Sequence, residues 1–125
     1  MKWEFSDDTP IYLQIMNGIK LQIASGNLQP GEKIASVRDL AMEAGVNPNT
    51  MQKALAELER EGVLCSQRTA GRFVAESKTR VEGMQKEMAR EQIVCFTQTM
   101  KQLGYEPKET LLLLEQYVNG KNNEE

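Results

Sequence analysis

The sequence predicts a mainly α-helical protein that contains one short β-hairpin. Apolar residues recur at helical spacing in five stretches, most of which begin at a capping residue or a proline and end at a glycine. One further stretch places a polar turn between two short apolar runs, the pattern of a hairpin. The 125 residues suffice for a small domain with an appendage. Because the composition changes at Ser77, we expect one part over residues 1–76 and a second over residues 77–125.

The first two helices are bounded by recognisable signals. Residues 10–25 carry an isoleucine at every fourth position, with Pro10 at the first helical position. The second helix begins after Ser36, whose side chain can cap it, and Asp39 completes an S-x-x-D capping box. Gly45 ends this helix. We expect the apolar faces of both helices to be buried in one core.

A third helix begins three residues after the second one ends. Asn47 is its expected cap, Pro48 is its first residue and Gly62 ends it. Residues 63–74 then form the hairpin, with a polar loop over residues 68–71. Three helices followed by a hairpin make a winged helix-turn-helix, in which the third helix is the recognition helix and the hairpin is the wing.

The start of the third helix is the candidate DNA-contacting surface. A helix N-terminus presents unpaired N–H groups and a partial positive charge, so it can face phosphates and base edges in the major groove. Asparagine and glutamine can form two hydrogen bonds to adenine, and lysine can reach guanine or phosphate. Arginines in the second helix and the wing suit the phosphate backbone or the minor groove. The residues assigned to DNA binding are Ser36, Arg38, Asn47, Asn49, Thr50, Gln52, Lys53, Arg68, Thr69, Gly71 and Arg72.

Each assignment also has a purely structural alternative. For Asn47 we favour the helix cap over a DNA contact, whereas for Gln52 and Lys53 we favour the contact. Arg38 alternatively forms a surface ion pair, which contributes little to stability. The arginines of the hairpin loop alternatively belong to a flexible polar turn.

The second part of the chain predicts a dimerisation tail. Residues 77–103 form one long helix and residues 107–119 a last one, followed by a frayed end. Apolar residues of the long helix follow spacings of 4, 3, 4 and 3, the pattern of a packing seam, and the last helix is apolar on nearly all sides. We favour a two-fold homodimer over packing within one chain, because the first part already buries its own apolar faces. The residues assigned to the dimer contact are Ile93, Phe96, Met100, Leu103, Leu111, Leu114, Tyr117 and Val118.

Composition excludes several classes of function. The chain has no histidine, which excludes the usual Cys/His zinc sites and histidine-based catalysis. No phosphate-binding loop or nucleophile–base pair is recognisable, so we expect no enzyme activity, no metal and no cofactor. We expect Cys65 and Cys95 to be free thiols and mostly buried. No apolar run is long enough to cross a bilayer, and the first residues lack a signal-peptide pattern, so we expect a cytoplasmic protein with no membrane partner.

Two other functions remain open. The net charge of −3 mildly favours a winged-helix adaptor that binds proteins and not DNA, and if DNA binds, the positive charge must gather on one face. A small-molecule sensor is compatible with the main interpretation, although its effector is unknown. The roughly 50 residues of the tail are too few for a separate ligand domain, so any effector site is expected at the dimer seam.

The stretch from Pro10 to Phe73 resembles the GntR family of bacterial transcription regulators, through the segments "PIYLQI", "ASGNLQPGEKIASVRDLA", "GVNPNTMQKALAELEREGVL" and "AGRFV". The short tail is similar to that of the YtrA subfamily. This resemblance implies a sequence-specific repressor that dimerises through its tail, binds an inverted repeat, and controls a neighbouring transport operon, often of an ABC exporter, together with its own gene. It also implies DNA contacts at the assigned residues. Many members carry arginine where this chain has Pro48 and Gln52, so their base preference does not carry over.

Overall fold

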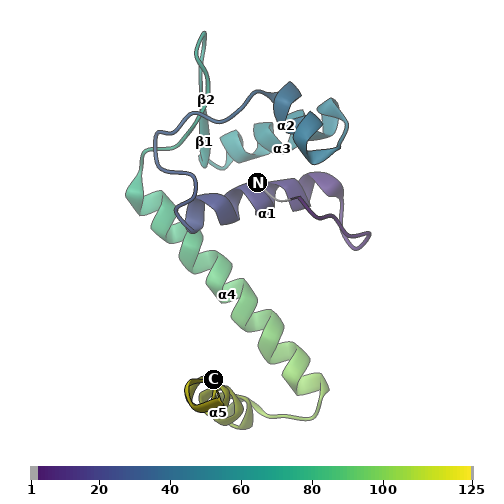
Figure 1. Cartoon of the computed structure of the whole chain (residues 1–125), viewed down its shortest axis with the longest axis vertical. Coiled ribbons are helices and arrows are strands. Elements are labelled where there is room, and N and C mark those ends of the chain that lie inside the picture. Colours follow the sequence, from purple (N-terminus) through teal and green to yellow (C-terminus); the bar gives the residue numbers. More distant parts are fainter. Residues whose placement is uncertain (1–2, 125) are drawn as a thin grey trace. The chain divides into compact units, whose positions relative to one another are not determined.

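The computed structural model describes residues 3–124, with side chains described as far as Gly120. Over these residues it contains five helices and one two-stranded antiparallel sheet (Figure 1). In chain order the elements are α1 (Ile11–Ala24), α2 (Val37–Ala44), α3 (Pro48–Arg60), β1 (Leu64–Gln67), β2 (Gly71–Val74), α4 (Lys78–Gln102) and α5 (Pro107–Glu124). The mainly helical fold is confirmed, with the helix-turn-helix and the hairpin in the predicted order. The chain divides into two compact units, Met1–Gln85 and Lys86–Glu125, and each is described by itself.

Helix α1 buries one face in the core of the first unit. All isoleucines of the four-residue repeat except Ile11 are buried, as their spacing predicts. The prediction for Pro10 was wrong in detail: its ψ of 142° is not helical, so Pro10 is the N-cap and not the first helical residue. Gly18, in the middle of the helix, makes room for the ring of Trp3, which lies 3.5 Å from where a Cβ would stand. The N-terminal segment therefore packs against α1.

Two side-chain caps and one glycine form the turn between α2 and α3. The Ser36 hydroxyl oxygen accepts a hydrogen bond from the N–H of Asp39 at 3.1 Å. Gly45 ends α2 with a φ of 71°, in the left-handed region that glycine adopts without strain. Asn47 Oδ1 then accepts from the N–H of Asn49 at 2.7 Å. Both predicted caps are confirmed, and they fix where the recognition helix begins.

Strands β1 and β2 form the wing. Their register runs from the pair Leu64–Val74 at the base to the pair Gln67–Gly71 at the tip. The predicted hairpin is confirmed, with one correction: Gly71 is the first residue of β2, so the loop covers residues 68–70 only.

A segment that precedes α2 pairs with the outer side of β2. The N–H of Ile34 donates to the carbonyl of Arg72 at 3.0 Å, and an isolated bridge joins Lys33 to Phe73. Residues 31–34 thus act as a short third strand, which no pattern in the sequence predicted. This pairing brings the chain just before α2 beside the wing.

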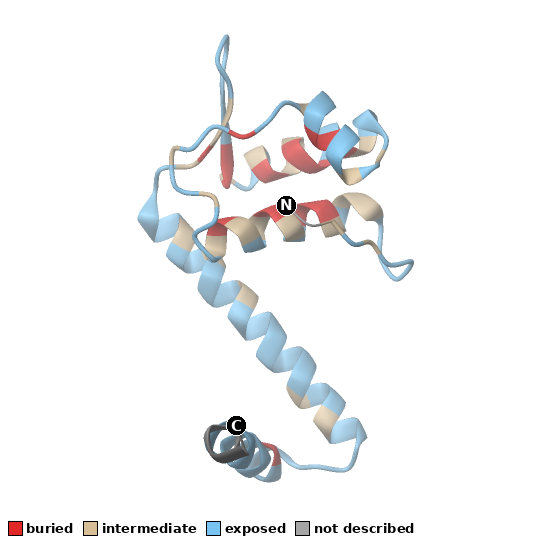
Figure 2. Ribbon diagram, viewed as in Figure 1, coloured by how far each residue is buried: buried red, intermediate tan, exposed pale blue. Residues whose placement is uncertain are grey.

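The core of the first unit lies among α1, α2, α3 and the base of the wing, where the buried residues gather (Figure 2). The apolar stripe predicted for α3 is confirmed, because Met51, Ala54, Leu55 and Leu58 are all fully buried. Full burial of one large apolar side chain contributes about 1.5–3 kcal/mol. The other buried apolar residues are Ile15, Met16, Ile19, Ile23, Ile34, Leu40, Ala41, Val63, Leu64 and Val74.

The second unit contains the rest of α4 together with α5. Helix α5 was expected to end at residue 119, but it continues to Glu124, so the described part of the expected frayed end is helical. Among the side chains described in this unit, only that of Thr110 is buried. One copy of the unit therefore forms no apolar core of its own over its described residues.

Both cysteines are free and exposed. The expectation that they are buried was wrong for a physical reason. Along β1 only Leu64 is buried, and Cys65 is directed to solvent. No described residue of α4 is buried, so that Cys95 is exposed as well.

Candidate nucleic-acid interface

The first turns of α3 present polar side chains to solvent. Asn49, Gln52 and Lys53 are exposed, and Thr50 is half-buried. They alternate with the buried apolar residues of the same helix, so polar and apolar side chains occupy different faces. Asn47 is exposed too, although its Oδ1 is engaged in the cap.

Lys53 is held by a residue of α1. Its Nζ lies 4.0 Å from the centroid of the Tyr12 ring. A cation over an aromatic face is stabilised by about 0.5–1 kcal/mol at an exposed site. Helix α1 therefore restricts where the ammonium group of the recognition helix can lie.

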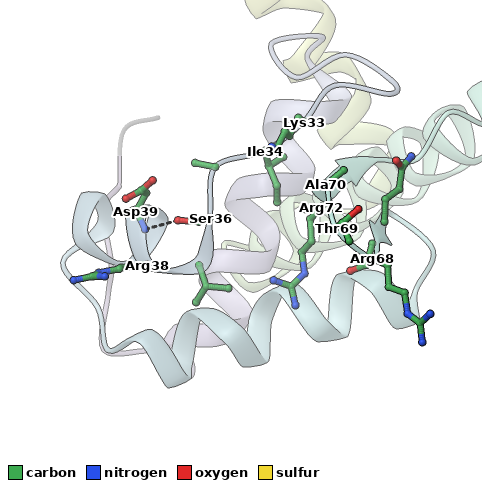
Figure 3. Close-up of a pocket in the computed structure, with 14 residues that line it drawn as sticks. Lys33, Ile34, Ser36, Arg38, Asp39, Arg68, Thr69, Ala70 and Arg72 are labelled. Atoms are coloured by element: carbon green, nitrogen blue, oxygen red, sulfur yellow. Dashed lines mark hydrogen bonds between the residues drawn. The ribbon is translucent and has the colours of Figure 1, made fainter.

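A groove of about 980 Å³ lies between the start of α2 and the wing (Figure 3). The residues assigned to α3 and its cap do not line it. The groove does bring together the assigned residues of α2 and the wing, which are Ser36, Arg38, Arg68, Thr69, Gly71 and Arg72.

The charged residues that line the groove are mostly cationic. They are four basic residues, Lys33, Arg38, Arg68 and Arg72, and one acidic residue, Asp39. The chain as a whole has a net charge of −3, so the positive charge gathers at this groove against the overall balance.

Lys33 was missed by sequence reasoning. It lies in the short third strand, and its Cε is 3.2 Å from where a Cβ on Gly71 would stand. Lys33 therefore reaches the wing from a segment far away in the sequence. A signal for this residue would have required knowing that residues 31–34 pair with β2.

The arginine side chains of the groove differ in how far other residues cover and bind them. Arg38 is exposed, and its guanidinium points away from the labelled wing residues (Figure 3). Arg68 is exposed in the wing loop. The side chain of Arg72, by contrast, is only 19 % exposed, and its Nε donates to Glu59 of α3 at 2.5 Å. Arg72 is thus held between the wing and the recognition helix.

Glu59 has a second partner in the wing. The hydroxyl of Ser66 donates to the same carboxylate oxygen, Oε1, at 2.5 Å. This hydrogen bond, together with the hydrogen bond and the charge of Arg72, lowers the pKa of Glu59, although partial burial acts in the opposite direction. Glu59 is therefore a carboxylate at neutral pH.

The residues assigned to the dimer contact are largely uncovered in the second unit. Met100 is half-buried, and the rest are exposed; Ile93, Leu103 and Tyr117 keep 64 %, 67 % and 65 % of their surface in solvent. Val94, Leu112 and Leu113, which the sequence reasoning did not assign, are exposed in the same unit.

The described residues contain no group of three or more Cys, Asp or Glu side chains arranged to hold a metal ion. Of the helices in the described part of the chain, none combines the length and the apolar character that a membrane crossing requires.

Comparison with known proteins identifies the family. The model of the gntR family of bacterial regulatory proteins matches residues 11–74, just over half of the chain. The chain is 36 % identical over 117 residues to YhcF of Bacillus subtilis, an HTH-type transcriptional regulator, covering 94 % of this chain and 97 % of YhcF. It is 46 % identical over 77 residues to the transcriptional repressor YtrA of the same organism, but that match covers 60 % of this chain and 59 % of YtrA.

Solved structures agree with this assignment. A GntR family transcriptional regulator from Listeria monocytogenes superposes with a TM-score of 0.83 at 34 % identity, covering 90 % of this chain and 98 % of that one. The DNA-binding domain of AraR in complex with operator ORX1 superposes with a TM-score of 0.55 at 30 % identity, covering 60 % of this chain and 96 % of that domain. The resemblance seen in the sequence, including its YtrA-like character, is confirmed. The chain therefore belongs to the GntR family of bacterial regulatory proteins, which regulate transcription by binding DNA and are not enzymes.

Proposed function

We propose that the chain is a homodimeric repressor that binds an inverted repeat in operator DNA. The recognition helix α3 of each copy enters the major groove at one half-site, and the wing holds the flanking backbone. The observation that carries this proposal is the cationic groove between the start of α2 and the wing, in a chain whose overall charge is negative. The negative net charge of the whole chain does not attract DNA, so we expect the face that carries the groove to meet the duplex.

Base recognition is assigned to the exposed start of α3. Asn49 and Gln52 carry amide groups that can form paired hydrogen bonds to adenine. Lys53, held near Tyr12, reaches guanine or a phosphate from a restricted position. Thr50 and the cap residue Asn47 complete this surface and place the helix end against the backbone.

Backbone contacts are assigned to the groove. Its basic residues neutralise phosphates, which supplies affinity without sequence preference. The hydroxyl groups of Ser36 and Thr69 can donate to phosphate oxygens. Gly71 has a φ of 103° and no Cβ, so the side chain of Lys33 can lie against the wing at this point and present its ammonium group beside the wing arginines.

Dimerisation is assigned to the second unit. Its large apolar side chains are mostly exposed, and over its described residues it lacks a core, which is typical of a surface that a partner covers. A second copy of the same surface, related by a two-fold axis, covers both faces at once. The assigned contact residues are those of the α4 seam and of α5, from Ile93 to Val118.

Repression is proposed from the relatives, since YtrA of Bacillus subtilis is a transcriptional repressor. The resemblance of the sequence to the YtrA subfamily adds a transporter operon and the protein's own gene as proposed targets. The proposed location is the cytoplasm. AraR, whose DNA-binding domain resembles this chain, was crystallised with operator DNA, which supports a duplex operator as the partner.

The test is selection of bound duplexes from a random-sequence library, followed by footprinting of the selected sequence. We expect a palindromic site whose half-sites lie one or two helical turns apart, with about 34–36 Å per turn. A single footprint without palindromic symmetry would contradict the dimer arrangement.

The adaptor remains the second candidate because of the net charge of −3. A gel shift with random duplex DNA at low salt separates the two functions. An adaptor without DNA affinity leaves the duplex unshifted, whereas the proposed repressor retards it increasingly as the salt concentration falls.

A further inference from the structure

One carboxylate of α3 holds both strands of the wing. Glu59 Oε1 accepts from Ser66 of β1 and from Arg72 of β2. Ser66 and Arg72 face each other as a register pair of the hairpin. A single oxygen of the recognition helix is therefore bonded to a cross-strand pair of the wing.

This contact is stronger than an ordinary surface ion pair. The side chains of Arg72 and Glu59 are only 19 % and 30 % exposed, so solvent screens them incompletely. Both hydrogen bonds are assisted by charge, which roughly doubles their strength over neutral ones. The backbone bonds of the wing join β2 to residues 31–34, and the bond of Glu59 joins the wing to α3.

The geometry also leaves Arg72 able to bind an anion. A guanidinium carries five N–H donors, and the bond to Glu59 uses the one on Nε. Arg72 lines the groove, so its two Nη atoms can meet a phosphate while Nε stays on Glu59. A planar guanidinium that is held at one edge loses less freedom when its other edge binds.

We propose that Glu59 is a positioning residue for DNA binding, which sets the wing and the guanidinium of Arg72 relative to α3 so that both reach the duplex together. This inference rests on the proposed function. The proposal predicts a change in DNA affinity opposite to the one expected from charge. Removing a carboxylate beside a DNA-binding groove should by charge alone tighten binding to a polyanion, whereas we expect the loss of Glu59 to weaken binding.

Glu57 provides a matched control. It lies on the same helix, its side chain is also 30 % exposed, and it pairs with Arg60 at 2.9 Å within α3. Substitution of Glu57 or Glu59 by Ala or Gln changes the charge equally. Only the substitutions of Glu59 remove the charge-assisted bonds between α3 and the wing.

The experiment measures binding of the full chain to a duplex that the wild type selects from a random library. We expect Glu59→Ala to weaken binding by about tenfold or more, as for loss of a hydrogen bond to a charged group, and Glu57→Ala to bind as tightly as the wild type or more tightly. Footprints of Glu59→Ala should lose protection at the flanking phosphates and keep it over the central bases. In an Arg72→Ala background, Glu59→Ala should weaken binding less than it does in the wild type, since only the bond to Ser66 is left to lose.

Circular dichroism verifies that each variant is folded, and Glu59→Gln, which keeps the shape of the side chain, replaces Glu59→Ala if the latter is not. Binding of the Glu59 variants as tight as that of the Glu57 variants, with a complete footprint, would overturn the positioning role. A wild type that selects no duplex would overturn the proposed function and this inference with it.

Discussion

At the scale of single residues, the polar side chains of this protein divide into those fixed by the fold and those free for a ligand. Ser36 and Asn47 each accept a backbone hydrogen bond at a helix start, whereas Gln52 has its whole side chain available on the exposed face of α3. We therefore expect base recognition from the free side chains, such as that of Gln52. The capping residues fix the start of the helix that carries these side chains.

Gln52→Ala tests the reading role. A paired hydrogen bond from an amide to adenine contributes about 1–3 kcal/mol of discrimination against other bases, so the variant should tolerate every base at one position of each half-site. Selection from a randomised operator library measures this preference. Gln98→Ala, on the exposed surface of α4, is the control and should select the wild-type sequence. Uniform loss of affinity on all sequences would contradict base reading by Gln52.

Lys33→Ala tests the cation that sequence reasoning missed. Because a phosphate contact carries no sequence information, the variant should weaken binding equally on all duplexes and reduce the slope of log affinity against log salt by about one. Titrations at several salt concentrations give the slope. Lys101→Ala, in the last turn of α4, should leave it unchanged. The same slope for Lys33→Ala and the wild type would show that Lys33 does not meet the backbone.

Glu59 also predicts a dependence of stability on pH. Its pKa is lowered in the folded chain, chiefly by the Ser66 hydrogen bond and then by Arg72. The stability that ionised Glu59 contributes is therefore fully present above the pKa that Glu59 has in the unfolded chain, which includes neutral pH. It is lost as the pH falls through the lower pKa that Glu59 has in the folded chain. Denaturant unfolding over a pH series measures this. Between neutral and acidic pH, the free energy of unfolding should fall less for Glu59→Gln than for the wild type, and by an intermediate amount for Ser66→Ala. Parallel profiles for all three proteins would contradict the assignment.

At the scale of elements, local signals predicted where most helices begin, and they failed where the chain folds back on itself. Caps act through neighbours in sequence, so Ser36 and Asn47 could be recognised without a structure. The strand-like pairing of residues 31–34 and the bond between Glu59 and Arg72 depend on which distant segments meet. The end of α5 was misjudged because Gly120 costs a helix only about 1 kcal/mol, and no proline follows it.

Gly62, in the turn after α3, and Gly83, in α4, should respond in opposite ways to alanine. Gly62 has a φ of 79°, and a Cβ there would lie 2.8 Å from the guanidinium carbon of Arg80, which donates to the carbonyl of Glu61 at 2.7 Å. Gly83 lies within α4 with nothing within 4 Å of its Cβ position. We expect Gly62→Ala to destabilise by about 1 kcal/mol or more and Gly83→Ala to stabilise by about 0.5–1 kcal/mol.

Chemical denaturation of each variant measures these changes. In an Arg80→Ala background the cost of Gly62→Ala should fall, because the clash with the guanidinium is gone while the unfavourable φ remains. An equal cost in both backgrounds would show that the contact with Arg80 does not matter.

At the scale of the whole molecule, the sequence predicted the exposed apolar surface of the tail, but its net charge gave the wrong indication about nucleic acid. Surplus apolar surface in the tail was foreseeable, because a spacing of 4 and 3 residues marks a seam whether or not its partner is known. The net charge of −3 pointed away from nucleic acid, because a sum over the chain does not reveal that four basic residues line one groove.

Phe96→Glu tests the proposed dimer. Placing a charge at an apolar contact should convert the protein to a monomer at micromolar concentration, as measured by sedimentation equilibrium, because the desolvation of an unpaired carboxylate opposes association. Binding to a full inverted repeat should then fall to that of one half-site, since the second half-site no longer gains from the first. Gln98→Glu adds the same charge at an exposed polar position of α4 outside the seam and should remain dimeric. A dimeric Phe96→Glu protein would place the interface elsewhere.

The gathering of four basic residues at one groove has a consequence for how such a regulator meets DNA. Its remaining surface is acidic in sum, so a collision with DNA in most orientations meets repulsion and ends without capture. The collisions that lead to capture are therefore those in which the groove faces the duplex, whatever the sequence of that duplex.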